Sequence, residues 1–406
     1  MNIALAGIGG YGEVYLRCLL DPMSAHNGLR LVAAIDPQPA RCGQRGTLLE
    51  RGVPLFASLE AMYDAGIAPD LVVLATPLHL HADQAVLAME SGSHVLCEKP
   101  LAATPTDAAR MIAARDRTGR TLAVGFQWSF APAVLALKTD IAAGRYGRPM
   151  SLKTKVYWPR GRTYYGRNGW AGRIATPGGQ TVLDSPVNNA CAHFIHSMLD
   201  LVIDAWDGSD WPAVVEADLY RANAIENYDT AVVRCRTRGG IELLAAVSHA
   251  TERTLEPVFE YTFERGRIAC DANANGGRIV GTFDDGSTID YGPQPGGNDV
   301  EKLWSTVESI RNGRPNAGPA ESAAAHTALV ASVQEAGVAD FGHAYVSERE
   351  DGRGVFVPGL DAVLDRCYAD RLLPSELGAV PWARAGREAA VGRMDALRVQ
   401  AAGAAT

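Results

Sequence analysis

Near its start the chain reads Ile3-Ala4-Leu5-Ala6-Gly7-Ile8-Gly9-Gly10-Tyr11-Gly12, and this stretch decides the fold of the first domain. A short apolar run ends in glycines spaced as GxGxxG, and apolar residues then recur at helical spacing from Val14 to Leu20. This order predicts a strand, a glycine turn and a helix. The first glycine allows the tight turn, the second lets a pyrophosphate approach the backbone, and the third lets the helix pack on the strand. We therefore predict a dinucleotide-binding site at this turn.

A second apolar run, residues 31–35, ends in Asp36, twenty-four residues after Gly12. An acidic side chain at this spacing accepts both hydroxyls of the adenosine ribose and repels a 2′-phosphate, which favours NAD over NADP. Arg41 is close enough in the sequence to leave NADP open. The alternative is that Asp36 is only a turn residue in front of Pro37.

Further apolar runs at residues 71–75, 95–97 and 122–124 alternate with helical stretches, which predicts a right-handed, parallel, doubly wound sheet. After residue 127, strand-like runs separated by hairpin turns predict an open, mostly antiparallel sheet with flanking helices. The fold class is therefore α/β plus α+β. The predicted parts are a Rossmann domain at residues 1–126, a second domain at 127–380 and a tail at 381–406.

Three helices are expected in the second half of the chain, one from Pro186 to Asp204 and two at residues 299–312 and 320–336, which return towards the first domain. The Ala/Arg-rich tail from Glu388 is expected to be a surface helix or frayed.

The length, net charge and cysteine content of the chain limit the classes of function that it can have. A chain of 406 residues is too long for one ordinary core, so two domains are expected. A net charge of -8 argues against nucleic acid or an anionic membrane as partner, and no apolar run approaches membrane-spanning length. The seven cysteines include no CxxC pair, which suits reduced thiols and gives no zinc signature. Because the chain runs directly into a strand without a signal peptide, we expect a cytoplasmic protein.

A candidate base lies in Cys97-Glu98-Lys99-Pro100, directly after the strand predicted at residues 95–97. Open α/β sheets place their ligands at the carboxyl ends of their strands. Pro100 restrains Lys99 to an extended conformation, and a lysine in a partly dry cleft can lose its proton and act as a base. The alternative is a solvated surface lysine beside a turn proline.

These pieces together resemble the glucose–fructose oxidoreductase/inositol dehydrogenase (Gfo/Idh/MocA) family. The resemblance covers roughly residues 1 to 340 and is carried by five blocks, at residues 7–12, 76–81, 92–101, 125–127 and 170–188. It implies a Rossmann domain, an open C-terminal sheet and an active site between them. It also implies a homodimer or homotetramer formed through the outer face of that sheet.

The resemblance further implies oxidation of a sugar or cyclitol hydroxyl with NAD(P). Lys99 would take the hydroxyl proton, Glu98 would accept from the nicotinamide ribose, and Gln127 would face the nicotinamide. The implied cofactor-binding residues are Gly7, Ile8, Gly9, Gly10, Tyr11, Gly12, Asp36, Thr76, Pro77, His81, Glu98, Lys99 and Gln127.

The chain departs from the family pattern at one catalytic position. Asp184 is in place, but Asn188 stands where the family has an acid/base histidine, and Pro186 replaces a glycine. Asparagine orients a hydroxyl but cannot shuttle a proton, which leaves Lys99 as the main base, with Asp184 and Asn188 orienting the hydroxyl. His193 is a candidate replacement, although it lies about 140° round an ideal helix from Asn188.

An aromatic and basic loop supplies the remaining substrate candidates, Trp158, Arg160, Tyr165, Arg167 and Trp170, with Tyr164 and Asn168 beside them. Aromatic rings stack on a pyranose and arginines bind its hydroxyls, so the loop is either a sugar platform or a domain-packing loop.

A stripe of Asn189, His193, His196 and Asp200 is interpreted as a polar seam, and no metal site is assigned.

Three functional hypotheses follow. The leading one is an NAD(P)-dependent dehydrogenase acting on a sugar, sugar derivative, glycoside or cyclitol, with Lys99 as the base. The first alternative is a lyase or glycosidase in which NAD is used and regenerated in place. The second is a non-catalytic protein that senses a nucleotide or sugar.

Overall fold

The computed structural model describes residues 1–204, 210–296 and 299–392. The chain divides into two compact units. The first contains residues 1–130 and 299–324, and the second contains residues 131–295 and 325–392. Each unit is described by itself below.

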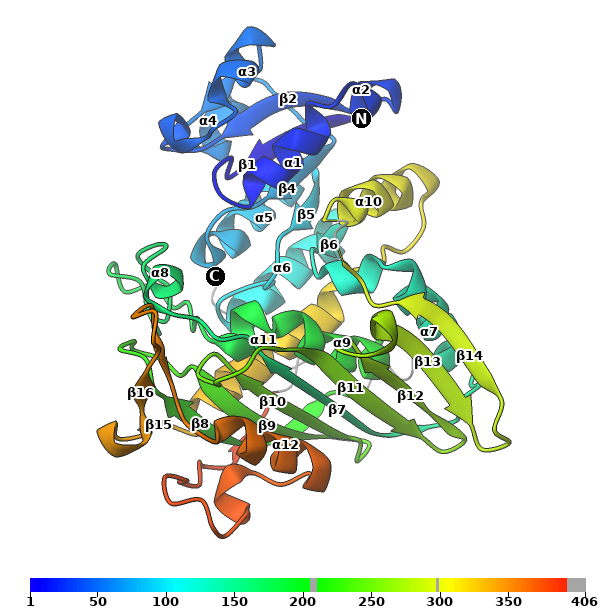
Figure 1. The fold of residues 1–406 in the computed structure, drawn as a ribbon. Coiled ribbons are helices and arrows are strands. Elements are labelled where there is room, and N and C mark those ends of the chain that lie inside the picture. Colours follow the sequence, from blue (N-terminus) through cyan, green and yellow to red (C-terminus); the bar gives the residue numbers. More distant parts are fainter. Residues whose placement is uncertain (205–209, 297–298, 393–406) are drawn as a thin grey trace. The chain divides into compact units, whose positions relative to one another are not determined.

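The first unit is built on a six-stranded parallel sheet in the order β3-β2-β1-β4-β5-β6, drawn in blue to cyan in Figure 1. This order is that of a doubly wound Rossmann sheet, so the predicted fold class of the first domain is confirmed. The strands are β1 (Asn2–Ala6), β2 (Arg30–Ile35), β3 (Leu55–Phe56), β4 (Leu71–Leu74), β5 (His94–Cys97) and β6 (Leu122–Val124). The helices are α1 (Gly12–Leu19), α2 (Pro22–His26), α3 (Arg45–Glu50), α4 (Leu59–Asp64), α5 (His81–Glu90), α6 (Pro105–Thr118) and α10 (Glu301–Asn312).

Helix α10 joins this unit from far along the chain. Its buried Leu303 and Val307 pack in one cluster with Ile3 of β1 and Leu16 of α1. Local signals also fix the ends of helices: Thr104 accepts a hydrogen bond from the backbone N–H of Asp107 and so caps α6.

The second unit is built on a mostly antiparallel sheet in the order β14-β13-β12-β11-β7-β10-β9-β8-β15, as predicted. Among the described strands of this second sheet, only the pairs β7 with β10 and β8 with β15 are parallel. The strands are β7 (Pro149–Tyr157), β8 (Pro212–Arg221), β9 (Thr230–Thr237), β10 (Glu242–Ser248), β11 (Leu255–Phe263), β12 (Gly266–Asp271), β13 (Arg278–Phe283), β14 (Thr288–Pro293) and β15 (Val338–Asp340). The helices are α7 (Pro132–Ala142), α8 (Arg162–Tyr165), α9 (Ala192–Ile203), most of α11 (Ala320–Gln334) and α12 (Leu360–Asp370).

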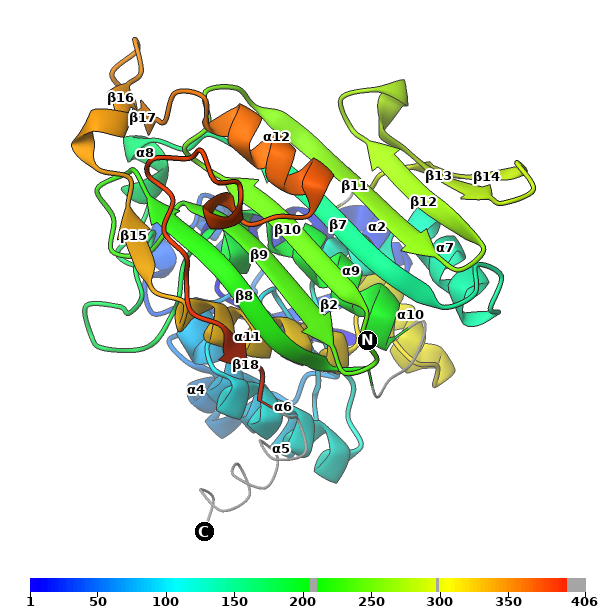
Figure 2. The same cartoon turned by 90° about the horizontal axis from the view of Figure 1, so that it is seen from below.

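Both faces of the central strands are covered by the chain itself. A helical turn at Pro186–Ala190 contacts β9 and β10, and α9 contacts β7 on the same face. Figure 2 shows α12 lying across the opposite face. There Leu360 and Leu364 of α12, with Trp382, pack against Tyr157 of β7 and Leu244 of β10.

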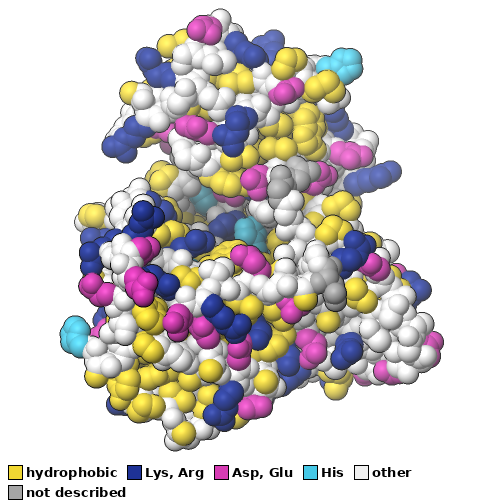
Figure 3. Space-filling model, viewed as in Figure 1, with side chains coloured by type: hydrophobic (Ala, Val, Ile, Leu, Met, Phe, Trp, Pro, Cys, Tyr) yellow, Lys and Arg dark blue, Asp and Glu magenta, His cyan; other side chains and the backbone are white. Residues whose placement is uncertain are grey.

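The described part of the tail forms neither the surface helix nor the frayed end that we expected. Ala389–Ala390 form a short strand, β18, that pairs antiparallel with β8. Residues 393–406 of the predicted tail lie outside the described residues. Within the described ranges, no helix is long and apolar enough to cross a membrane. On the face shown in Figure 3, acidic and basic side chains are interspersed in each unit.

Candidate active site

The glycine turn has the geometry that a dinucleotide requires. Gly7 has a φ of +81°, and a Cβ placed on it would lie 2.5 Å from the carbonyl oxygen of Ala75. A Cβ on Gly12 would lie 1.9 Å from the carbonyl oxygen of Gly7, so only glycine lets α1 start this close to β1. A Cβ on Gly9 would meet nothing within 4 Å, which leaves open space above the turn for a phosphate. The turn therefore fits the pyrophosphate of a dinucleotide.

Asp36 follows β2 directly and faces this turn. One carboxylate oxygen accepts from the backbone N–H of Ile8 at 3.3 Å, and the other accepts from that of Gln38 at 2.7 Å. The side chain thus stabilises its own turn and also lies beside the glycine turn. Its position is compatible both with binding the adenosine ribose and with a role as a turn residue only.

His81 connects two of the blocks that carry the family resemblance. Its ring nitrogens lie 2.9 Å from the carbonyl oxygen of Thr76 and 3.0 Å from that of Pro100. Burial lowers the pKa of this imidazole, and a neutral ring donates to only one of the two carbonyls. The geometry gives His81 a positioning role between the loop after β4 and the corner at Lys99.

Lys99 lies half-buried immediately after β5, and its peptide bond to Pro100 is cis. Its backbone N–H donates to Glu98 Oε2 at 3.2 Å. Gln127 begins a short helical turn after β6 and is also half-buried. Because carboxyl ends of parallel strands share one edge of a sheet, Lys99 and Gln127 lie at the same edge as the glycine turn.

A buried ion pair holds Glu98, and sequence reasoning missed two of its members. Glu98 Oε1 lies 2.5 Å from Lys302 Nζ of α10 and also accepts from the Tyr15 hydroxyl at 2.5 Å. Lys302 Nζ donates to the Tyr11 hydroxyl at 3.0 Å as well. Burial alone would lower the pKa of Lys302, but the Glu98 carboxylate holds it above its ordinary value. The available signal was a lysine beside Leu303 on the apolar stripe of its helix.

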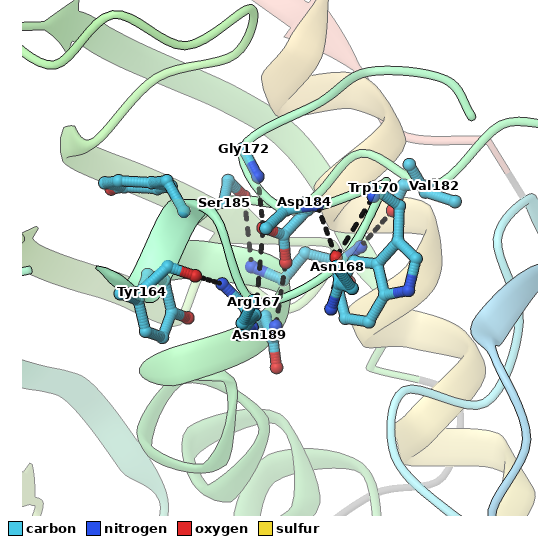
Figure 4. A network of polar contacts seen from close by, with 12 residues as sticks. Tyr164, Arg167, Asn168, Trp170, Gly172, Val182, Asp184, Ser185 and Asn189 are labelled. Atoms are coloured by element: carbon cyan, nitrogen blue, oxygen red, sulfur yellow. Dashed lines mark hydrogen bonds and ion pairs between the residues drawn. The ribbon is translucent and has the colours of Figure 1, made fainter. Parts of the chain in front are cut away.

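Asp184 organises the candidate substrate region of the second unit (Figure 4). Its carboxylate accepts from the Gly172 N–H at 2.6 Å and from Asn189 Nδ2 at 2.7 Å, and Arg167 Nη2 lies 3.6 Å away. The side chain is 4% exposed. Asp184 therefore joins the loop that carries Arg167 to the helical turn that carries Asn189.

Asn188 is buried and serves the backbone. Its Nδ2 donates to the carbonyl oxygens of Val182 at 3.1 Å and Leu183 at 3.2 Å. Leu183 has a φ of +46°, a conformation that costs a non-glycine residue about 1–3 kcal/mol. The Asn188 amide thus holds the strained residue next to Asp184. A role for Asn188 in binding substrate stays a prediction.

The single helix predicted from Pro186 to Asp204 is wrong. Pro186–Ala190 form a π-helical turn, and α9 begins at Ala192. The π-helical turn adds residues to a turn of helix, so the angle that we derived between Asn188 and His193 does not apply. His193 lies in the first turn of α9 and is half-buried.

Replacing Asn188 tests whether its amide stabilises the backbone at Val182 and Leu183. Asn188→Ala leaves two carbonyls without their donor, and we expect a loss of about 1–3 kcal/mol in the free energy of unfolding. Asn188→His should recover at most part of it, since a neutral imidazole has one N–H. Urea unfolding of both variants measures the effect, and an unchanged midpoint in Asn188→Ala would contradict the assignment.

The aromatic and basic loop folds onto itself. The Arg160 guanidinium lies 5.2 Å from the centre of the Tyr164 ring and 5.7 Å from that of Trp158. The Arg167 guanidinium lies 3.8 Å from the Tyr164 ring and 5.1 Å from that of Trp170. These candidates are therefore brought together as one cluster.

Tyr165 points to a residue that sequence reasoning missed. Its hydroxyl lies 3.0 Å from Nδ1 of His249, which follows β10 and is 1% exposed. No local sequence signal marks His249, because its neighbours in the cluster are more than eighty residues away.

The polar seam on α9 has a cationic partner. Lys138 of α7 pairs with Asp200 at 3.2 Å and with Asp204. Among the described residues, no group of three or more His, Cys, Asp or Glu side chains is arranged to hold a metal ion.

The fold and the glycine turn together define an NAD-binding Rossmann protein. Residues 1–126 match the sequence model of the GFO_IDH_MocA family, described as an oxidoreductase family with an NAD-binding Rossmann fold. Over these residues the first domain is similar to the Gfo/Idh/MocA oxidoreductases, as its sequence motifs indicated, and NAD is the cofactor of the matched fold.

Known proteins extend the comparison. Inositol 2-dehydrogenase 1 of Saccharopolyspora erythraea is 34% identical over 154 residues, which are 37% of this chain and 44% of that protein. The 1,5-anhydro-D-fructose reductase of Ensifer adhaerens is 37% identical over 123 residues, 30% of this chain and 35% of that one. The chain thus spans less than half the length of the curated relatives it matches.

A solved structure shares the fold more widely. The WlbA dehydrogenase of Bordetella pertussis, crystallised with NADH and UDP-GlcNAcA, superimposes with a TM-score of 0.63 at 24% identity. The match covers 82% of this chain and 95% of that one. It extends the fold likeness beyond the Rossmann domain into the second unit.

Proposed function

We propose that this protein is an NAD-dependent dehydrogenase that oxidises a hydroxyl of a sugar, sugar derivative, glycoside or cyclitol. The observation that carries the proposal is the Glu98-Lys99-Pro100 corner at the carboxyl end of β5, in a matched NAD-binding domain. The names of two relatives, inositol 2-dehydrogenase and 1,5-anhydro-D-fructose reductase, support this substrate class. Arg41 leaves NADP open as a second cofactor.

Oxidising an alcohol requires that a hydride and a proton leave the substrate. Bound NAD would supply the hydride acceptor. Lys99 takes the hydroxyl proton, as a base placed at the edge of the sheet where the glycine turn lies. The Lys302 ammonium pairs with the Glu98 carboxylate, and Glu98 in turn accepts from the Lys99 backbone N–H. The base is therefore held on a rigid, buried support.

In the second unit, Asp184 binds and orients the substrate hydroxyl, and Asn188 keeps Asp184 in place through the Leu183 backbone. The Asn188 side chain cannot carry a proton, so Lys99 acts without the usual histidine partner. We retain His193 as a residue that contacts substrate.

A product assay tests the proposal. The protein is incubated with NAD or NADP and a panel of sugars, glycosides and cyclitols, while reduced cofactor and products are recorded together. Net reduced cofactor with one substrate class supports the dehydrogenase. Bond cleavage without net reduction would select the lyase or glycosidase alternative, and cofactor binding with no turnover on the panel would favour the sensor.

The expected assembly concerns the outer face of the sheet. On this face α12 packs against β7 and β10. Strands β12 and β13 of the same sheet keep exposed or half-buried side chains, among them Arg267, Ala269, Arg278 and Val280. We propose the homodimer or homotetramer that the resemblance implies, formed through this sheet. Light scattering should give two or four times the 43.2 kDa of the chain, and a mass near 43.2 kDa would contradict the proposal.

A cytoplasmic location remains part of the proposal. None of the seven cysteines, all within the described residues, forms a disulfide. Thiols in this number suit a reducing compartment.

A further inference from the structure

The rings of the aromatic and basic loop are already occupied. Both guanidinium groups contact the Tyr164 ring, and each also lies over one tryptophan. A pyranose that stacked on these rings would have to displace an arginine, at the cost of a cation–π contact. The loop therefore presents positive charge to a ligand, and not a bare aromatic face.

Arg160, Arg162 and Arg167 of this loop differ in how their charge is balanced. Arg167 lies 3.6 Å from Asp184, and the exposed Arg162 pairs with Glu348 at 3.4 Å. Among the described residues, no carboxylate lies within ion-pair distance of Arg160, and its buried Nε has no hydrogen-bond partner. A buried N–H without an acceptor is costly, so this half-buried guanidinium needs an acceptor from elsewhere.

A second donor without an acceptor lies beside it. The His249 carbonyl accepts from the Arg160 backbone N–H at 2.9 Å, and the His249 ring lies 5.4 Å from the Tyr164 ring. The His249 side chain is buried, and among the described residues its Nε2 has no partner. Burial first, and the charges of Arg160 and Arg167 next, lower the pKa of His249 to about 3, so the ring is neutral at neutral pH.

The tautomer of His249 follows from its partner. Burial raises the pKa of Tyr165, so its hydroxyl is protonated and can donate to Nδ1 of His249. In that arrangement Nε2 carries the hydrogen. Two N–H donors, Arg160 Nε and His249 Nε2, then lack an acceptor in a cluster that also holds a guanidinium with no acidic partner.

From this cluster we infer a subsite for an anionic oxygen group of the substrate, a carboxylate or a phosphate, bound by Arg160 with His249 behind it. A planar guanidinium binds such a group through two parallel hydrogen bonds, and several oxygens satisfy more than one donor. The inference rests on the proposed function and narrows its substrate class to acidic sugars: a hydroxyl is oxidised on a molecule that also carries an anionic group.

Matched pairs of ligands test the subsite on the full chain. Calorimetry with saturating NAD compares glucose with glucuronate and with glucose 6-phosphate, galactose with galacturonate, and myo-inositol with an inositol monophosphate. We expect the anionic member of a pair to bind about tenfold or more tightly, as hydrogen bonds to a charged group would produce. The carboxylate and phosphate arms show which anion the subsite takes.

Two substitutions assign the effect to Arg160. Arg160→Met keeps an apolar stem over the rings and should lower affinity for the anionic ligand by about 10- to 100-fold, with little change for the neutral one. Arg160→Lys keeps the charge but cannot form two parallel hydrogen bonds, so its affinity for the anionic ligand should lie between those of the wild type and Arg160→Met. Arg162→Met removes a neighbouring arginine that is paired with Glu348, and should leave both affinities unchanged.

The outcomes separate this inference from the proposed function. Equal or better binding of the neutral members, no binding of any anionic member, or an unchanged affinity in Arg160→Met would overturn the subsite. Anion-selective binding that depends on Arg160, with no reduced cofactor formed, would keep the subsite and overturn the dehydrogenase. Reduced cofactor formed from neutral sugars alone would keep the dehydrogenase and overturn the subsite.

Discussion

Replacing Lys99 by alanine is expected to lower kcat by about 10²- to 10⁴-fold, the range typical for removing a general base. The alcohol proton would then leave without a positioned acceptor, while the glycine turn and Asp36 would still bind the cofactor. We therefore expect the affinity for NAD, measured by calorimetry, to change little. Initial rates with the substrate found in the panel assay give kcat.

Two controls keep this prediction specific. A small primary amine added to Lys99→Ala should restore part of the activity, because it supplies the missing base in the space that alanine leaves. Lys155→Met removes a half-buried lysine that pairs with Asp365 of α12, and should leave kcat near the wild-type value. Turnover of Lys99→Ala within about tenfold of wild type would contradict the assignment of Lys99 as the base.

The first unit could be predicted because its signals are local. The strand, glycine turn and helix at residues 3–19 follow from steric demands within a few residues of Gly7 and Gly12. The alternation of apolar runs and helices then leaves few topologies for a parallel sheet. The same local signals predict that Lys99 and Gln127 lie at one edge of that sheet.

The remaining site residues could not be predicted because their partners are distant in sequence. Lys302 reaches Glu98 across about two hundred residues, and His249 meets Tyr165 across more than eighty. The π-helical turn at Pro186–Ala190 was missed for another reason: the Asn188 amide there bonds the nearby Val182 and Leu183 carbonyls, and apolar periodicity does not report such bonds. Arg160 was named as a candidate, but its lack of an acidic partner is visible only in three dimensions.

Lys302→Met is expected to destabilise the protein by about 3–5 kcal/mol, the usual cost of removing one partner of a buried ion pair. Lys302 is 1% exposed and Glu98 is 8% exposed, so the remaining carboxylate cannot reach solvent without moving. The Tyr11 hydroxyl, in the glycine turn, loses its donor as well. Tyr11 belongs to the glycine turn that is expected to bind the dinucleotide, and its hydrogen bond to the charged Lys302 is lost. We therefore also expect the affinity for NAD to fall by about tenfold or more.

A matched lysine separates the two effects. Lys138→Met breaks a second buried pair, with Asp200 in the other unit, and should destabilise the protein without changing the affinity for NAD. The double variant Glu98→Gln, Lys302→Met leaves no unpaired charge and should recover much of the lost stability. Its NAD affinity should stay low, because neither the Glu98 carboxylate nor the donor to Tyr11 returns. Recovery of NAD affinity together with stability would instead mean that Lys302 acts only through folding.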